Sequence, residues 1–245
     1  MEIASEMVQL QAEEGPMPLF LARPAADGKY PAAVVVQEAF GLNAHIKDVV
    51  ARLAREGYAA LAPDLYYRES SAVVGYDNLQ EAIRLMMNLW DDKVVADMNA
   101  AIMHLQQQPS VHADRIGVTG FCMGGRITFL TACLNPAVKA AVPFYGGGIG
   151  SVQSSARTPQ APLDYADKLT APMLLFFGEN DSFIPLDEVE KIKRRLWELK
   201  KNAEVVVYPG APHGFFCNER DSYRADAAKD AWDRLLKFFG QHLKA

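Results

Sequence analysis

The sequence predicts an α/β fold with a mostly parallel central sheet, helices on both faces of that sheet and a short N-terminal β-hairpin at its edge. Two observations lead to this prediction. The first is a series of short apolar runs rich in valine, and the second is a series of longer stretches, alternating with those runs, whose apolar residues recur at helical spacing. Such alternation indicates βαβ units, in which the strands are parallel and buried on both faces.

The N-terminal half contains the hairpin and the first strand–helix units. Apolar runs of about seven residues are too short for a buried helix and therefore indicate strands. Gly57 follows the first amphipathic stretch and is a typical stop signal for a helix. The predicted elements are the hairpin at 7–24, strands at 32–38 and 58–64, a helix at 45–57 and a helical stretch in two pieces at 79–107.

The C-terminal half repeats the same alternation. Its predicted strands are 115–121, 138–145, 172–180 and 203–210, and its predicted helices are 123–134, 186–200 and 226–243. A segment at 146–164 is rich in Gly, Ser and Pro, and we interpret it as a loop because the alternation resumes after it. The sequence shows no repeat and no linker, so we expect a single domain over residues 1–245.

Composition excludes several classes of protein. Half of the 245 residues are hydrophobic, which is enough for a full core, and the net charge of −5 argues against a nucleic-acid-binding surface. The N-terminus lacks the pattern of a secretory signal, and no apolar run is long enough to span a bilayer, so we expect no membrane partner. Three cysteines without metal-like spacing suit a reducing compartment, and we expect a cytoplasmic protein.

The stretch GFCMGG at 120–125 is the first candidate for chemistry. It lies between a predicted strand and a predicted helix and matches the pattern G-x-nucleophile-x-G, with Cys122 as the nucleophile. A tight turn there projects the sulfur from the sheet edge, and the helix N-terminus favours its thiolate form. The backbone N–H of Met123 is then free to stabilise an oxyanion. The alternative is that Cys122, like Cys133, is a buried residue that only packs.

Two partners follow Cys122 in the order nucleophile, acid, histidine. His213 alone among the five histidines lies in a loop that follows a late strand. Glu179 and Asp181 both follow the preceding strand, and we select Asp181 because its shorter side chain suits a fixed hydrogen bond to the imidazole. Glu38, at the end of a buried valine-rich strand, is also a candidate, since an unpaired buried carboxylate is costly; the alternative is a strand-end glutamate that reaches water.

The motifs VVVQEAFGLN, APDLYYR, GFCMGG and GENDSFIP…APHGF together resemble those of the dienelactone hydrolase family of α/β-hydrolases, over nearly the whole chain. The resemblance implies that Cys122, Asp181 and His213 form a Cys-His-Asp triad and that Glu38 lies close to the thiol and helps to deprotonate it. It also implies an oxyanion hole formed by the amides of Ala39 and Met123. Tyr145 matches a tyrosine of the family that faces the active site.

The resemblance has one clear departure. Members that degrade aromatic compounds carry an arginine four residues after the catalytic histidine, where it binds the substrate carboxylate, and this chain has Cys217 there. A cysteine cannot replace the planar fork of an arginine. Arg84 lies near the region where a second arginine is expected, without a secure alignment. We expect Phe215 and Phe216 to form a more apolar pocket wall.

The sequence therefore predicts a hydrolase that cleaves an ester or lactone through a cysteine nucleophile and a thiol-acyl intermediate, as a carboxymethylenebutenolidase does. A general carboxylesterase acting on other small esters is the alternative. A third hypothesis, a redox-sensing thiol protein in which Cys122 pairs with Cys217, does not account for a histidine and an aspartate in triad order. We expect no metal, no organic cofactor and no partner beyond the small-molecule substrate, and by analogy with the family we expect a monomer.

Overall fold

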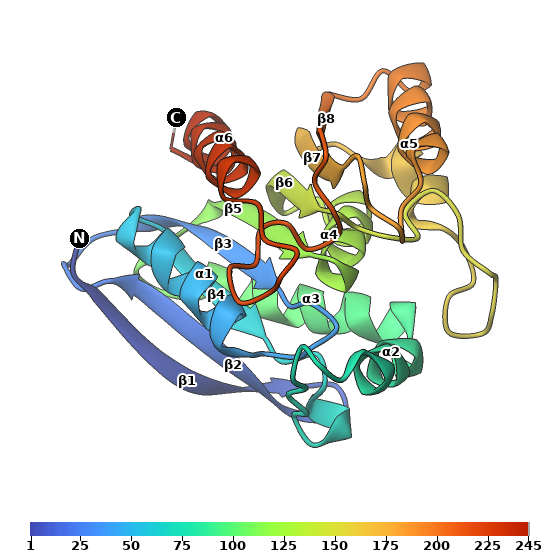
Figure 1. Ribbon diagram of the computed structural model, residues 1–245. Helices are drawn as coiled ribbons and strands as arrows, with labels where there is room; N and C mark the ends of the chain where they lie inside the picture. The colour runs from blue at the N-terminus through green and yellow to red at the C-terminus, as the bar shows by residue number, and fades with distance from the viewer. Residues whose placement is uncertain (245) are drawn as a thin grey trace.

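The computed structural model describes residues 1–244 and contains one eight-stranded sheet (Figure 1). The strands lie in the order β1-β2-β4-β3-β5-β6-β7-β8. Strands β3 to β8 are parallel, while the β1–β2 hairpin joins β4 antiparallel at one edge. The strand bounds are β1 Ile3–Ala12, β2 Gly15–Pro24, β3 Tyr30–Val36, β4 Ala59–Pro63, β5 Val111–Phe121, β6 Val138–Phe144, β7 Met173–Gly178 and β8 Ala203–Tyr208.

Helices cover both faces of the sheet. Helices α1 and α6 pack on one face, and α3 and α4 pack on the other, with α5 lying beyond α4 against β8 and a short helix (Figure 1). The helix bounds are α1 Ala44–Arg55, α2 Leu79–Asn88, α3 Asp91–Gln106, α4 Met123–Leu134, α5 Leu186–Glu198 and α6 Ala225–Leu243, and the 3₁₀ helices are η1 Tyr67–Glu69 and η2 Pro162–Lys168. Within residues 1–244, no helix combines the length and apolar character needed to cross a membrane.

The predicted α/β fold is confirmed, and most predicted elements lie where the sequence pattern placed them. The central strands consist almost entirely of buried residues, as expected of parallel strands covered on both faces. The helical stretch at 79–107 forms α2 and α3, separated by Leu89 and Trp90. The predicted loop at 146–164 is shorter than expected, because its last residues begin η2, where Pro162 occupies the first turn.

A buried carboxylate connects the first 3₁₀ helix to α3. The side chain of Asp97 is 1% exposed and accepts hydrogen bonds from Arg68 at 2.7 and 3.1 Å and from the Tyr67 hydroxyl at 3.1 Å. Arg68 also pairs with Glu14 in the hairpin turn. This cluster therefore links η1, α3 and the β1–β2 edge of the sheet.

We predict that Asp97→Ala lowers the free energy of unfolding by about 2 to 4 kcal/mol, because it leaves the Arg68 guanidinium partly buried without its main partner. Chemical denaturation measures this loss. Glu81→Ala, which breaks an exposed ion pair to Arg84 on α2, serves as the control and should leave the denaturation midpoint unchanged. Equal midpoints for the Asp97 variant and the unmodified protein would contradict the prediction.

Candidate active site

Cys122 lies between β5 and α4 in a backbone conformation that non-glycine residues rarely adopt. Its φ is +56° and its ψ is −118°. A residue in this region carries backbone strain that persists only where the surrounding structure imposes it. The turn is held by hydrogen bonds from the Cys122 amide to the Phe144 carbonyl and from the Gly125 amide to the Cys122 carbonyl. Cys122 is the only one of the three cysteines in residues 1–244 that is not fully buried.

The glycines around Cys122 permit close backbone approach. A Cβ atom on Gly120 would clash with the Gly124 carbonyl, and one on Gly124 would clash with the Val36 carbonyl of β3. The side-chain-free turn therefore lets α4 begin directly against the ends of β3 and β5. This close approach provides the physical reason for the G-x-C-x-G pattern in the sequence.

Asp181 and His213 meet beside this turn, from the loops after β7 and β8. The Nδ1 atom of His213 lies 2.7 Å from Oδ2 of Asp181, and both side chains are at least nine-tenths buried. The second carboxylate oxygen accepts hydrogen bonds from the amides of Phe183 at 2.9 Å and Ile184 at 3.2 Å. These contacts fix the orientation of Asp181 toward the imidazole. Glu179, the alternative acid, instead accepts a hydrogen bond from the Gly210 amide at 2.8 Å.

His213 also interacts with Cys122. Burial by itself lowers the pKa of His213, but attraction to the Cys122 thiolate and hydrogen bonds to Asp181 and Cys122 outweigh burial and raise that pKa to about 10. The imidazolium is therefore the stable form as long as the sulfur is negatively charged. The thiolate is the reactive form of a cysteine, and a nearby histidine is the kind of group that activates it.

This arrangement predicts the pKa of His213 in a Cys122→Ala variant. The thiolate stabilises the imidazolium over the neutral imidazole, so its removal should lower the pKa of His213 by about 1 to 3 pH units. An NMR titration of the imidazole nitrogens measures the change. Cys133→Ala, in the buried part of α4, is the control. An unchanged pKa in the Cys122 variant would show that the two side chains do not interact.

The amides of Ala39 and Met123 lie at the ends of neighbouring strands. Within residues 1–244 neither amide donates a hydrogen bond to another protein group. The fully buried Tyr66 hydroxyl donates to the Ala39 carbonyl at 3.0 Å and lies 3.5 Å from the Met123 sulfur. Tyr66 therefore links the segment that carries the Ala39 amide to Met123, which carries the other amide.

Glu38 is completely buried at the end of β3. Its Oε1 atom lies 3.6 Å from a guanidinium nitrogen of Arg220, and its Oε2 atom lies 3.5 Å from the Tyr76 hydroxyl. Burial raises the pKa of Glu38, while the charges of Arg220 and His213 and the hydrogen bond from Tyr76 oppose that rise. Burial is the larger effect, so the pKa of Glu38 is raised overall although nearby cations and one hydroxyl favour its charged form.

Arg220 was missed by the sequence reasoning, which looked for arginines four residues after His213 and near Arg84. It lies on the loop after β8, with its guanidinium 5.3 Å from the Phe40 ring centre and 5.6 Å from the Tyr76 ring centre. A Cβ atom at Gly214, whose φ is +78°, would clash with this guanidinium. The glycine after His213 therefore leaves room for an arginine to reach Glu38 (Figure 1, orange-red loop beside the end of β3).

The prediction that Phe215 and Phe216 form a pocket wall is wrong in this structure. Gly214 turns the chain inward, so both rings lie in the core, with exposures of 0% and 3%. Phe216 stacks on Phe121 at 5.0 Å, and Phe215 packs on Tyr145 at 5.2 Å. The sequence could not distinguish an aromatic pair lining a pocket from one filling the core.

Tyr145 and Phe183 contact the catalytic histidine from two sides. Both rings lie 5.1 Å from the imidazole of His213, but Tyr145 is fully buried while Phe183 is 57% exposed. The Tyr145 hydroxyl has no hydrogen-bond partner within residues 1–244. Tyr145 thus supports the imidazole from the core side, and Phe183 contacts it from the exposed side.

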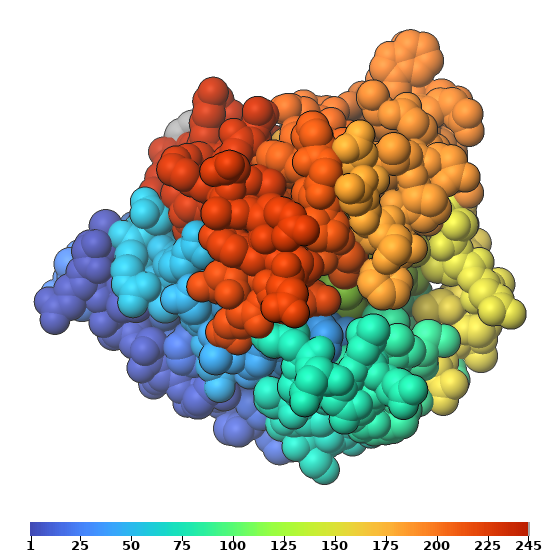
Figure 2. Space-filling model, in the orientation of Figure 1, coloured from blue at the N-terminus to red at the C-terminus, as the bar shows by residue number. Residues whose placement is uncertain are grey.

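Figure 2 shows a hollow on the surface above this site. The orange and orange-red loops after β7 and β8 face the teal region of α2 across it, and green and blue atoms are visible at its bottom. Arg84, which lies near the region where a second arginine was expected, is half exposed on α2 and pairs with Glu81 at 2.7 and 2.8 Å. Its guanidinium is therefore engaged on the helix surface.

A strained cysteine turn after β5, with an Asp–His pair at the ends of β7 and β8, defines the chain as an α/β-hydrolase. The family model of the "Dienelactone hydrolase family" matches residues 17–243. A crystal structure titled "Putative Dienelactone Hydrolase" from Klebsiella pneumoniae superposes with a TM-score of 0.91 at 39% identity, covering 99% of this chain and 100% of that one.

Curated relatives agree with the structural comparison. "Putative carboxymethylenebutenolidase" from Methylorubrum extorquens is 42% identical over 98% of this chain and 81% of its own length. A "Probable 2-oxo-3-(5-oxofuran-2-ylidene)propanoate lactonase" from Bradyrhizobium is 36% identical over 91% of this chain and 89% of its own length. The chain belongs to the dienelactone hydrolase family, and its enzyme class is carboxylic ester hydrolase.

Proposed function

We propose that the enzyme hydrolyses a small ester or lactone through a thiol-acyl intermediate on Cys122. The observation that carries this proposal is a strained, partly accessible cysteine after β5, at the sheet edge where a buried aspartate holds a histidine at 2.7 Å. A nucleophile, a base and a group that orients the base are the parts that covalent catalysis requires. The family match supports the reaction class, and the geometry supports the roles of these residues.

In the acylation step, the Cys122 thiolate attacks the substrate carbonyl and an S–C bond forms. The negative charge that develops on the carbonyl oxygen is stabilised by the amides of Ala39 and Met123, which have no acceptor of their own among residues 1–244. As the intermediate collapses, the ester C–O bond breaks, and the leaving oxygen takes a proton from the His213 imidazolium. A lactone substrate keeps this hydroxyl attached, because its ring opens.

In the deacylation step, His213 becomes the base. Once Cys122 is acylated, its sulfur is neutral, so the attraction that raises the pKa of His213 is gone. The neutral imidazole then accepts a proton from water as that water attacks the thioester. The C–S bond breaks, the acid leaves, and the Cys122 thiolate and the His213 imidazolium are restored.

Glu38 acts before the first step in this proposal. The family resemblance gives this residue the role of removing the thiol proton when substrate arrives. In the structure its carboxylate is held by Arg220 and Tyr76. A substrate that draws Arg220 away would free Glu38 to accept that proton. Glu38 then releases this proton to solvent, and later cycles start from the thiolate–imidazolium pair that deacylation restores.

The substrate class has two candidates. The lactonase relative is named for an unsaturated five-membered lactone that carries a carboxylate, and Arg220 is a cation close enough to the site to pair with such a group. A neutral ester is favoured by Cys217, which is buried and uncharged at the position where other members have arginine, and by the exposed ring of Phe183.

Parallel assays with a dienelactone and a short-chain nitrophenyl ester test the proposal, with iodoacetamide-treated protein as the control. Turnover that alkylation abolishes is the expected result, because Cys122 is the accessible thiol. Preference for the lactone would assign the carboxylate to Arg220, and preference for the ester would favour the neutral substrate. Turnover that survives complete alkylation of Cys122 would contradict the cysteine mechanism.

A further inference from the structure

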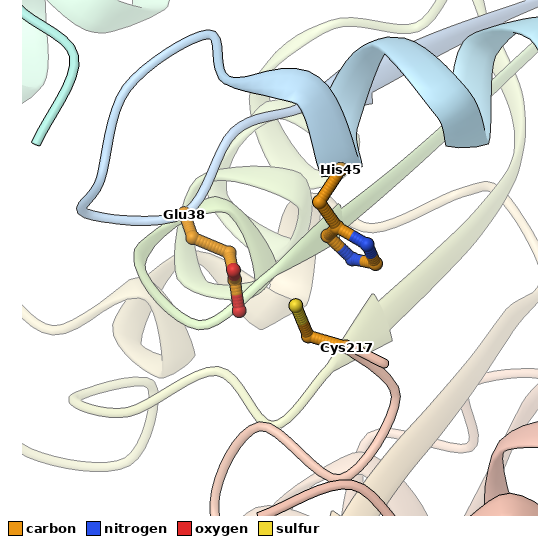
Figure 3. A group of neighbouring side chains, drawn as sticks. All are labelled: Glu38, His45 and Cys217. Atoms are coloured by element: carbon orange, nitrogen blue, oxygen red, sulfur yellow. The ribbon is translucent and has the colours of Figure 1, made fainter. Parts of the chain in front are cut away.

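Glu38 and two other potential metal ligands lie close together, although no sequence spacing indicated a metal site. Glu38 follows β3, His45 lies in the first turn of α1, and Cys217 lies in the loop after β8 (Figure 3). One ligand atom from each residue lies within 4.8 Å of the other two. All three side chains are buried, with exposures of 0% for Glu38, 2% for His45 and 0% for Cys217. The hydrolytic mechanism above uses neither His45 nor Cys217.

One side chain of this group has a polar atom without a partner: within residues 1–244, Nε2 of His45 makes no hydrogen bond. Oε1 of Glu38 also makes no hydrogen bond, but it forms an ion pair with Arg220 at 3.6 Å. A buried polar atom without a partner costs about 1 to 3 kcal/mol, so such atoms usually face a ligand, an ion or a water molecule.

We propose that Glu38, His45 and Cys217 form a binding site for a single borderline-soft divalent cation such as Zn²⁺ or Co²⁺. A carboxylate oxygen, an imidazole nitrogen and a thiolate sulfur make up a donor set typical of these ions, and the sulfur excludes Mg²⁺ and Ca²⁺. In a tetrahedral site the ligand atoms lie about 3.5 Å apart, so the cluster needs to contract by about 1 Å at most. Binding releases the Cys217 thiol proton to water, and the carboxylate and thiolate then balance the dication.

The surrounding groups suit this assignment. The Tyr76 hydroxyl lies 3.2 Å from the Cys217 sulfur and accepts a hydrogen bond from the Asn43 amide at 3.0 Å, so it is placed to orient the sulfur or to occupy the fourth position. Arg220 is the group that opposes a cation, since its guanidinium lies 3.6 Å from Glu38. Its side chain is 18% exposed, which gives it a route toward solvent when a metal takes the carboxylate.

A cation bound by Glu38, His45 and Cys217 would inhibit ester hydrolysis. A cation held by Glu38 competes with the role that the proposed function gives this carboxylate, so this consequence rests on the proposed function. The binding itself does not rest on that function.

Titration of a Cys122→Ala protein with Co²⁺ tests the site directly. That variant lacks the catalytic thiol, so a thiolate-to-cobalt charge-transfer band at one equivalent of metal identifies a cysteine ligand elsewhere. The band is expected to vanish when Cys217→Ser is added and to persist with Cys133→Ser, which alters a buried cysteine on α4. His45→Gln should weaken binding at least tenfold, and Arg220→Gln, which removes the competing cation, should strengthen it about tenfold.

No band in the Cys122→Ala protein, or a band that survives Cys217→Ser, would overturn the proposal. Circular dichroism of each variant ensures that loss of the band reflects a missing ligand, and the His45→Gln and Arg220→Gln variants test the site even if Cys217→Ser is unstable. Because this readout needs no turnover, it is independent of the catalytic proposal.

The inhibitory role has its own readout: Zn²⁺ should inhibit ester hydrolysis at least tenfold less in the Cys217→Ser protein than in the unmodified enzyme.

Discussion

Replacing Cys122 with alanine is expected to lower kcat for ester hydrolysis by at least about 10³-fold, because the thioester can no longer form. The remaining rate would come from the oxyanion amides of Ala39 and Met123 and from the binding of substrate. Steady-state kinetics with a nitrophenyl ester measure the loss. This prediction has the largest expected effect, since it removes the atom that bonds to the substrate.

The matched control for this substitution is Cys133→Ala. Cys133 lies on α4, is 4% exposed and is removed from the reacting groups. Burial raises the pKa of its thiol to about 12, so it is inert at neutral pH. Activity that falls equally in both variants would indicate damage to α4 rather than loss of the nucleophile, and full activity in the Cys122 variant would refute the mechanism.

Asp181→Asn is expected to lower kcat by about 10³- to 10⁴-fold without unfolding the protein. One oxygen of Asp181 accepts hydrogen bonds from the amides of Phe183 and Ile184, and the other faces Nδ1 of His213. An asparagine has a single oxygen, which the two amides would hold, so its NH₂ group would face Nδ1. That contact favours the wrong tautomer of the imidazole and leaves an imidazolium without its partner.

Glu179→Gln separates this effect from a general change in the loop after β7. Glu179 lies two residues before Asp181 and accepts a hydrogen bond from the Gly210 amide, which a glutamine oxygen can also accept. We expect kcat for this variant to stay within a factor of about two of the unmodified enzyme. A large loss in Glu179→Gln with little loss in Asp181→Asn would reverse the assignment of the acid.

Local patterns were sufficient to predict the fold and the order of the candidate catalytic groups. Buried strands such as β3 and β7 are short apolar runs, and the G-x-C-x-G turn combines a strand, a helix and glycines that can be recognised in one short segment. The histidine and the acid then follow because loops after parallel strands meet at one edge of the sheet. The choice of Asp181 over Glu179 depended on side-chain length, and the hydrogen bonds of the two carboxylates agree with it.

Contacts between distant segments could not be predicted in the same way. Phe215 and Phe216 follow His213 directly, yet the turn at Gly214 sends both rings into the core. Arg220 reaches Glu38 only because that same glycine leaves space for its guanidinium. The group of Glu38, His45 and Cys217 draws on three segments and carries no spacing signal. In each case the position depends on where a loop crosses the sheet edge, which periodicity does not determine.

Trapping the covalent intermediate is the most direct test of Cys122 as the nucleophile. The enzyme is mixed with an ester that deacylates slowly, quenched in acid and digested, and the peptides are analysed by mass spectrometry. We expect the mass of the acyl group on the peptide that contains Cys122. Hydroxylamine at neutral pH should remove this group, as expected of a thioester. Active enzyme that carries no acyl group on Cys122 under these conditions, or that carries it on a different residue, would contradict the central claim that this cysteine is the nucleophile.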